Sequence, residues 1–164
     1  MLCLTSAESA AMVAHARRQA PEEACGVIMT SPTGGRWYHE AENVQGARHL
    51  LDLDRHPSAT LAFCLDPDTL TQIIQRRRAG WRLAVIYHSH TNGLARLSRQ
   101  DIQQACNTLA EPVYPGTDYV IVAIDPRTGT CAVVAFRWVH RTRAFQPVPV
   151  QPGNVDIAGP ISLP

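Results

Sequence analysis

The feature that most constrains the fold is an apolar run that ends in two histidines. Residues 81–87, W-R-L-A-V-I-Y, are largely apolar and follow a glycine. A short apolar run of this kind, bounded by a turn residue and rich in β-branched and aromatic side chains, is typical of a buried strand. It leads directly into His88-Ser89-His90. The run therefore predicts a central strand, with the rest of a sheet and its covering helices arranged around it.

Three helices are predicted, over residues 5–19, 66–80 and 98–110. The first opens with the capping box Thr5-x-x-Glu8, and Pro21 ends it soon after residue 19. The second opens with Asp66 at the N-cap and Pro67 at the first helical position. In the first helix, alanines and valine give a thin apolar stripe that would pack on something flat: Ala10, Val13, Ala14 and Ala16.

Five further stretches are predicted as strands, over residues 24–30, 37–43, 60–65, 119–124 and 130–138. Between the second and third of these, residues 44–60 are polar and irregular, which predicts a long loop. The resulting fold class is α+β, with a single mixed β-sheet flanked by helices. The length of 164 residues suits one domain, which we place at residues 1–145. A Pro- and Gly-rich C-terminal tail is expected over residues 146–164.

Composition excludes several classes of protein. The formal net charge is +1, which does not favour nucleic-acid binding, and the basic run at residues 76–78 is expected to face water at a helix end. No apolar stretch approaches the ~18 residues needed to span a membrane. The N-terminus shows no signal-peptide pattern, and the five cysteines form no C-x-x-C pair. We therefore expect a cytoplasmic protein with reduced thiols, and neither nucleic acid nor membrane as a partner.

The two histidines are candidate metal ligands. Side chains two residues apart on a strand point to the same face, so His88 and His90 project together while Ser89 faces away. Two imidazoles on one rigid element can bind one zinc ion. A strand that ends in a loop can also carry two histidines by chance, so the pair alone does not identify a metal site.

Acidic residues complete a candidate catalytic site. Ser98-x-x-Asp101 is a helix N-cap, and the same geometry brings the Asp101 carboxylate within reach of the histidines as a third ligand. Three protein ligands leave a fourth position for water, which is typical of catalytic zinc. A general base would also be needed, and Glu22 and Glu23 stand side by side before an apolar strand. The strand pattern alone does not decide which of them faces inward.

The ordered set of motifs resembles a known family. His88-Ser89-His90, seven residues, Ser98, two residues and Asp101 follow without a gap, and Pro21-Glu22-Glu23-Ala24-Cys25-Gly26 lies upstream. Together they resemble the JAMM (MPN-plus) zinc metalloproteases, over about residues 4–138. The resemblance implies an MPN/JAB-like, cytidine-deaminase-like domain. It also implies zinc ligation by His88, His90 and Asp101, Glu23 as general base and acid, and Ser98 as oxyanion donor. Cys25 would then be a packing residue.

The resemblance also implies a class of substrate. Thr91 stands where many relatives have proline, which removes no ligand. The chain has little room for the insertions with which larger members bind a second ubiquitin. It is therefore most similar to the small prokaryotic members, which act on ubiquitin-like or sulfur-carrier proteins. The expected reaction is hydrolysis of the amide after the C-terminal Gly-Gly of such a protein.

Other interpretations fit the sequence less well. A non-catalytic MPN scaffold would typically lack ligands that are present here. A cell-wall or phage-tail peptidase usually carries a second peptidase domain. A metal site in the 44–60 segment has acidic and histidine side chains but no ordered element to position them: His49, Asp52, Asp54 and His56. A zinc deaminase is excluded because no P-C-x-x-C follows an H-x-E.

Overall fold

The computed structural model describes residues 1–151 of the chain. The strands are β1 (Leu2–Cys3), β2 (Cys25–Thr30), β3 (Arg36–Ala41), β4 (Arg82–His90), β5 (Asp118–Ile124), β6 (Cys131–Val139), β7 (Ala144–Val148) and β8 (Val150–Gln151). The helices are α1 (Ser6–Gln19), α2 (Gln45–Leu51), α3 (Pro67–Arg78) and α4 (Arg99–Ala105). Within residues 1–151, none of the helices combines the length and the apolarity that a membrane crossing requires.

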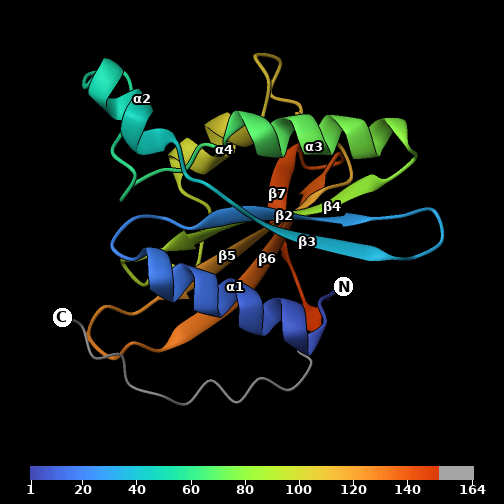
Figure 1. Cartoon of the computed structure of the whole chain (residues 1–164), viewed down its shortest axis with the longest axis horizontal. Helices are drawn as coiled ribbons and strands as arrows, with labels where there is room; N and C mark the ends of the chain where they lie inside the picture. The colour runs from blue at the N-terminus through green and yellow to red at the C-terminus, as the bar shows by residue number, and fades with distance from the viewer. Residues whose placement is uncertain (152–164) are drawn as a thin grey trace.

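The main sheet has six strands in the order β3-β2-β4-β5-β6-β7. Only β4 and β5 pair in parallel, so the sheet is mixed. Helix α1 covers one face, while α2, α3 and α4 lie on the other (Figure 1). The sequence-based prediction of an α+β fold with a single mixed sheet between helices is therefore confirmed, and β1 and β8 add a separate two-stranded pairing.

Strand β4 is central because both of its faces are covered. Every residue of β4 after Arg82 is buried. On the α1 side, Tyr87 packs in one apolar cluster with Met12 and Ile28 of α1 and β2. On the opposite side, Ile86 packs in a second cluster with Ile73 of α3. Two separate cores thus fix β4 between them, and its last three residues extend the strand through His88-Ser89-His90.

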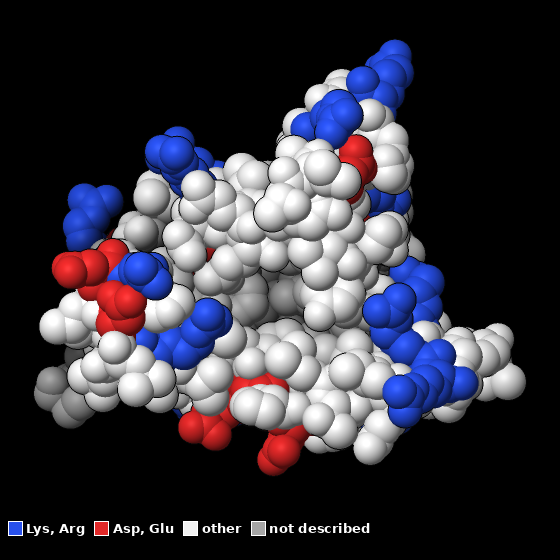
Figure 2. All heavy atoms as spheres, turned by 90° about the horizontal axis from the view of Figure 1, so that it is seen from above, with Lys and Arg blue, Asp and Glu red and all other residues white. Residues whose placement is uncertain are grey.

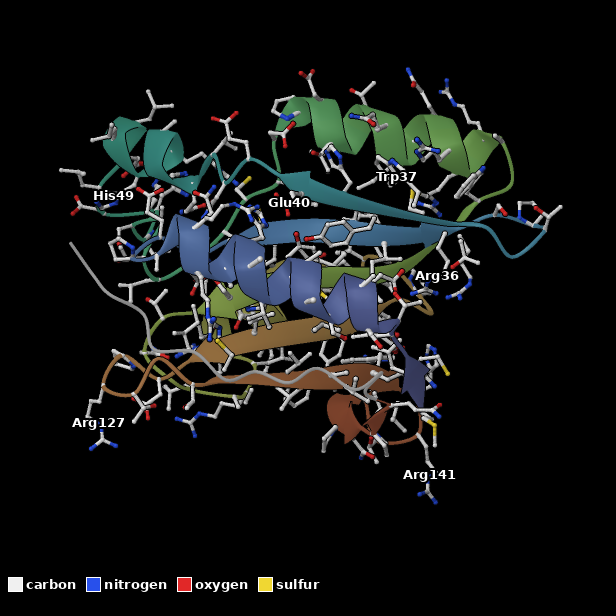
Figure 3. The ribbon with its side chains drawn as sticks, turned by 60° about the horizontal axis from the view of Figure 1, so that its bottom comes forward. Arg36, Trp37, Glu40, His49, Arg127 and Arg141 are labelled. Atoms are coloured by element: carbon white, nitrogen blue, oxygen red, sulfur yellow. The ribbon has the colours of Figure 1, made fainter. Side chains whose placement is uncertain are left out.

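The buried face of α1 differs from the predicted stripe. Ala10 and Ala14 are exposed, whereas the polar residues Glu8 and His15 are buried. Glu8 forms an ion pair of 2.6 Å with Arg36, which Figure 3 shows near the start of α1, and His15 Nδ1 shares a hydrogen bond of 2.9 Å with the Tyr87 hydroxyl. Because both groups have polar partners, their burial costs little. A prediction based on apolar spacing alone could not include them.

Two predictions between residues 44 and 65 were wrong. The expected loop contains the helix α2, and residues 60–65 form no strand, contributing only an isolated bridge between Asn43 and Leu65. Asn43 explains both differences: its Oδ1 accepts hydrogen bonds from the backbone N–H groups of Gln45 and Cys64, at 3.0 Å each. These side-chain bonds take the place of a strand ladder in residues 60–65 and fix the entry to α2.

The ends of two other predicted segments also shift. The third helix stops at Ala105, and the Asn107 side chain then accepts the N–H groups of Leu109 and Glu111 in a local turn. The C-terminal tail was expected from residue 146, but β7 pairs with β6 through Val148, and β8 follows. The rest of the predicted tail, residues 152–164, lies outside the described residues.

Gly26 is required by the close approach of β2 and β4. It lies directly opposite Tyr87, whose ring folds over it. A Cβ atom at this position would lie 2.5 Å from Tyr87 Cε1 and would also collide with the backbone oxygen of His39. The glycine that follows Cys25 in the upstream motif therefore makes room for a core tyrosine, one residue before the first histidine.

We predict that Gly26→Ala destabilises the protein by about 1–3 kcal/mol, because overpacking a rigid core forces strand β2 away from β4. Chemical denaturation should show a lower midpoint. Gly46→Ala is the matched control, since its added Cβ meets only Ala59 Cβ at 3.8 Å and lies in α2, where alanine is favoured. An unchanged midpoint for Gly26→Ala would contradict the packing argument.

Candidate active site

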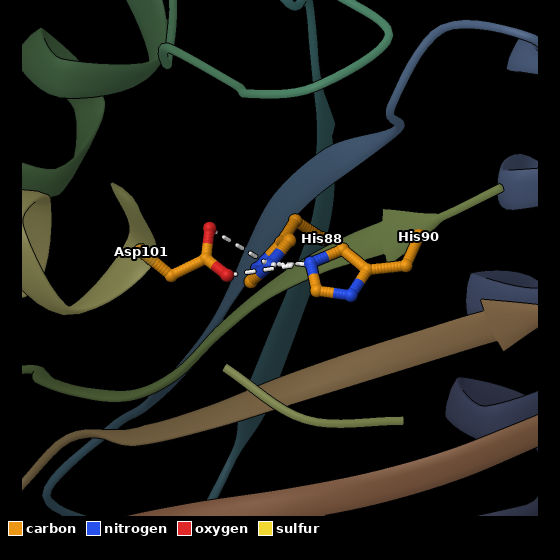
Figure 4. Close-up of side chains that lie close together, drawn as sticks. All are labelled: His88, His90 and Asp101. Carbon is orange, nitrogen blue, oxygen red and sulfur yellow. Dashed lines mark hydrogen bonds and ion pairs between the residues drawn. The ribbon is translucent and has the colours of Figure 1, made fainter. Parts of the chain in front are cut away.

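His88, His90 and Asp101 converge at the end of β4. The two Nε2 atoms lie 3.1 Å apart, and each lies 3.3 Å from an oxygen of Asp101 (Figure 4). All three side chains are buried. Among residues 1–151, they are the one group of His, Cys, Asp and Glu side chains close enough to share a metal ion.

The spacing of these atoms fits a tetrahedral metal ion. Ligands at about 2.0–2.1 Å from zinc, separated by the tetrahedral angle, lie about 3.3 Å from one another. The His90 Nδ1–H donates a 2.7 Å hydrogen bond to the Leu94 carbonyl, so in the neutral ring Nε2 is the atom with a lone pair. That nitrogen faces a carboxylate and a second imidazole nitrogen. Two imidazole nitrogens and a carboxylate are ligands that zinc commonly takes in proteins, so the donor set fits zinc.

Neighbouring groups hold each of the three side chains in place. His88 stacks on Phe63, with ring centroids 4.6 Å apart. Asp101 is fixed by its capping box, in which its Oδ2 accepts the Ser98 N–H at 2.6 Å and its own N–H donates to Ser98 Oγ at 3.1 Å. Sequence analysis identified the capping box but missed Phe63 and the Leu94 carbonyl, because neither belongs to a pattern of ligand residues.

Burial and mutual contact shift the acidities of this cluster. Burial alone would raise the pKa of Asp101, but hydrogen bonds from His88 and His90 hold it well below its usual range. Burial lowers the pKa of His88. Burial also raises the pKa of Glu23 to about 8, an effect that His90 opposes and Asp101 reinforces. The site thus keeps one carboxylate ionised and leaves the other able to carry a proton near neutral pH.

The structure distinguishes between the two upstream glutamates. Glu22 is exposed, whereas Glu23 is 4% exposed and its Oε1 lies 4.0 Å from His90 Nε2. Its Oε2 is buried and has no hydrogen-bond partner within residues 1–151. An unpaired buried oxygen is costly unless a ligand or water meets it. Glu23 is therefore the glutamate that faces the histidines.

The backbone around Glu23 is held by two polar side chains. Ser89, which faces away from the histidines as expected, accepts the Ala24 N–H on Oγ at 2.8 Å. Asn43 Nδ2 donates to the Glu23 carbonyl at 2.8 Å, and the Glu23 N–H donates to the Ala59 carbonyl at 2.8 Å. Asn43 is a positioning residue that sequence analysis missed. An asparagine at the end of a strand gives no signal of its own.

Two cavities flank the cluster. One is mostly apolar, includes Asp101 and Phe63 in its wall and measures about 240 Å³. The other measures about 370 Å³ and is lined by Glu23, His90 and Ser98. Figure 2 shows the molecule from the side of α2, α3 and α4, where the surface is hollowed near its centre. The cluster thus borders one mostly apolar cavity and one that also contains charged and polar side chains.

The alternative metal site in residues 44–60 does not form. His49 Nδ1 donates to the His56 carbonyl at 2.6 Å, and Asp52 pairs with Arg55 at the surface. Cys25 is buried, burial holds the pKa of its thiol far above the usual value, and it packs in the apolar cluster that contains Ile86. It thus has the environment of a packing residue.

Comparisons with known proteins find similar sequences. The sequence profile of the family described as prokaryotic homologs of the JAB domain matches residues 6–151. A probable TtuB-protein conjugate cleaving protease of Thermus thermophilus is 33% identical over 122 residues, covering 74% of each chain. The CysO-cysteine peptidase of Mycobacterium tuberculosis is 34% identical over 118 residues, covering 71% of this chain and 69% of the relative.

Solved structures share the fold. The solution structure of a protein from Desulfitobacterium hafniense superposes with a TM-score of 0.63 at 24% identity and covers 94% of both chains. A second, from Salinibacter ruber, gives a TM-score of 0.55 at 18% identity and covers 98% of this chain and 97% of that one. At these identities the similarity establishes the architecture alone.

Proposed function

The chain belongs to the family of prokaryotic homologs of the JAB domain, and on that premise we propose that it is a zinc-dependent peptidase acting on carrier-protein conjugates. The bond hydrolysed is the amide that follows the C-terminal Gly-Gly of a ubiquitin-like, sulfur-carrier-type protein. The observation that carries the proposal is the spacing of 3.1–3.3 Å among the His88, His90 and Asp101 ligand atoms, beside the unpaired Glu23 oxygen.

His88, His90 and Asp101 would hold the metal. Zinc bound there supplies Lewis acidity and lowers the pKa of water towards ~7. Glu23 accepts a proton from the attacking water and returns it to the leaving amine, as the carbon–nitrogen bond breaks and a carboxylate forms. Glu23 is buried beside His90, with its Oε1 4.0 Å from His90 Nε2, so its carboxyl group lies where it can exchange a proton with groups bound next to the cluster. Ser98 Oγ accepts the Asp101 N–H, so its own hydroxyl remains free to donate to a developing oxyanion.

The substrate class follows from the relatives and from the shape of the site. Of the two named relatives, one is a probable protease that cleaves TtuB-protein conjugates, and the other is a CysO-cysteine peptidase. The ligand cluster is buried, so a chain must enter in extended form and approach it closely. Glycine residues permit the closest backbone approach, which favours a Gly-Gly end over a general peptide.

We predict that the purified protein holds about one zinc per chain, and that His88→Ala and Asp101→Ala hold much less. Each variant leaves two ligands, which is too few for a catalytic zinc site. Elemental analysis after dialysis measures the content. His49→Ala is the matched control, because His49 lies in α2 (Figure 3) and donates to the His56 carbonyl outside the cluster. This variant should retain full zinc. Full zinc in both cluster variants would place the metal elsewhere.

The function is tested with two conjugates, CysO-cysteine and a small ubiquitin-like protein that carries a short extension after its Gly-Gly. Mass spectrometry should show release of the cysteine or the extension. Glu23→Gln should retain zinc and fold but slow hydrolysis by about 10²–10⁴-fold, because an amide cannot take a proton. Glu22→Gln should remain near wild type, since Glu22 is exposed.

Two results would contradict the proposal. Intact conjugates alongside digested casein would indicate a general peptidase. Full loss of activity in Glu22→Gln, with an active Glu23→Gln, would show that Glu22 transfers the proton and that the assignment to Glu23 is wrong.

A further inference from the structure

The cavity on the Glu23 side carries a charge that the proposed hydrolysis does not use. Arg96 and Arg99 line it together with Glu23, His90 and Ser98. Both arginines are exposed, and neither pairs with an Asp or Glu of residues 1–151. The one acidic side chain in the wall, Glu23, is buried and has an unpaired oxygen. The cavity therefore presents two cations to whatever enters it.

The cavity on the other side of the cluster has a different character. Its wall is mostly apolar, with Leu65, Leu70, Ile86 and Tyr119 among its side chains. Its one cation, Arg48, directs Nη1 to Cys64 Sγ at 3.1 Å. The two cavities that border the site thus differ in polarity, and the two halves of a substrate are expected to differ in the same way.

Glu23 indicates which half of the substrate enters the polar cavity. In the proposed reaction, Glu23 gives a proton to the leaving amine, so the amine must lie on its side of the cluster. The carrier's acyl half then lies towards the apolar cavity. Arg96 and Arg99 consequently face the leaving group and not the carrier.

We infer that Arg96 and Arg99 bind the free α-carboxylate of the leaving amino acid, so that the preferred substrate is a carrier joined to a single amino acid through its α-amine. This inference rests on the proposed function. Arginine pairs with carboxylates through two parallel hydrogen bonds, and such charged bonds are among the strongest in proteins. The chain contains no lysine, so every basic side chain in Figure 2 is an arginine.

The chemistry of the leaving group separates this substrate from a conjugate between two proteins. In an amino acid linked through its α-amine, the carboxylate lies two bonds from the scissile nitrogen. In an isopeptide, the lysine side chain places four methylene groups between that nitrogen and Cα, and the carboxyl group is part of a neutral peptide bond. Cations next to the Glu23 side of the cluster therefore favour the first kind of leaving group.

The test compares two probes that differ in one charge: CysO joined to cysteine, and CysO joined to cysteinamide. Wild type should cleave the acid with a kcat/KM about tenfold or more above that of the amide, in keeping with a charge-assisted hydrogen bond. In the double variant Arg96→Gln/Arg99→Gln, this ratio should fall to about one. A role in folding alone would not change the ratio, because both probes meet the same protein.

Arg141→Gln is the matched control, since Arg141 is exposed in the turn after β6 and points away from the molecule in Figure 3. It should keep the wild-type ratio. A wild-type ratio near one, or a ratio that survives in the double variant, would overturn this inference and leave the proposed function intact. Failure of zinc-loaded wild type to cleave either probe would overturn the proposed function, and this inference with it.

Discussion

Two imidazole nitrogens and a carboxylate lie within 3.3 Å of one another where solvent is almost excluded, and the rest of the structure depends on that crowding. Polar groups in such a place have lost their hydration, so their burial is costly unless they meet one another, or a shared ion, in a fixed geometry with rigid supports. Strand β4 supplies the supports. It is buried on both faces, which fixes the direction of its side chains before any metal is considered.

The two faces of β4 have separate tasks. On the face towards α1, the Tyr87 hydroxyl shares a hydrogen bond with His15, and Ser89 Oγ accepts a hydrogen bond from the Ala24 N–H. These two bonds hold α1 and the start of β2 against the strand. The opposite face carries His88 and His90. Because β2 runs antiparallel beside β4 with Cys25 opposite His88, the residue two places before Cys25 falls next to the histidines. The position of Glu23 is thus a consequence of strand register, and Gly26 preserves that register by admitting the Tyr87 ring.

The sequence predicted the elements that carry strong local signals. The capping boxes at Thr5 and Ser98, the Asp66-Pro67 start and the apolar run before His88 each have a physical mechanism within a few residues, and the structure contains all of them. The choice between Glu22 and Glu23 could be made only from the structure, because it depends on which side chain the neighbouring strands bury. Asn43 could not be predicted at all, since its amide joins segments about twenty residues apart. Helix α2 was not predicted because its segment contains polar residues and has no apolar stripe.

The central claim is that His88, His90 and Asp101 hold one zinc ion that no cysteine touches. X-ray absorption at the zinc edge tests it most directly, because nitrogen or oxygen ligands and sulfur ligands differ in distance. The account predicts only nitrogen and oxygen neighbours, at about 2.0–2.2 Å, with the multiple scattering of two imidazole rings. A sulfur neighbour at about 2.3 Å, or a spectrum without imidazole scattering, would contradict it.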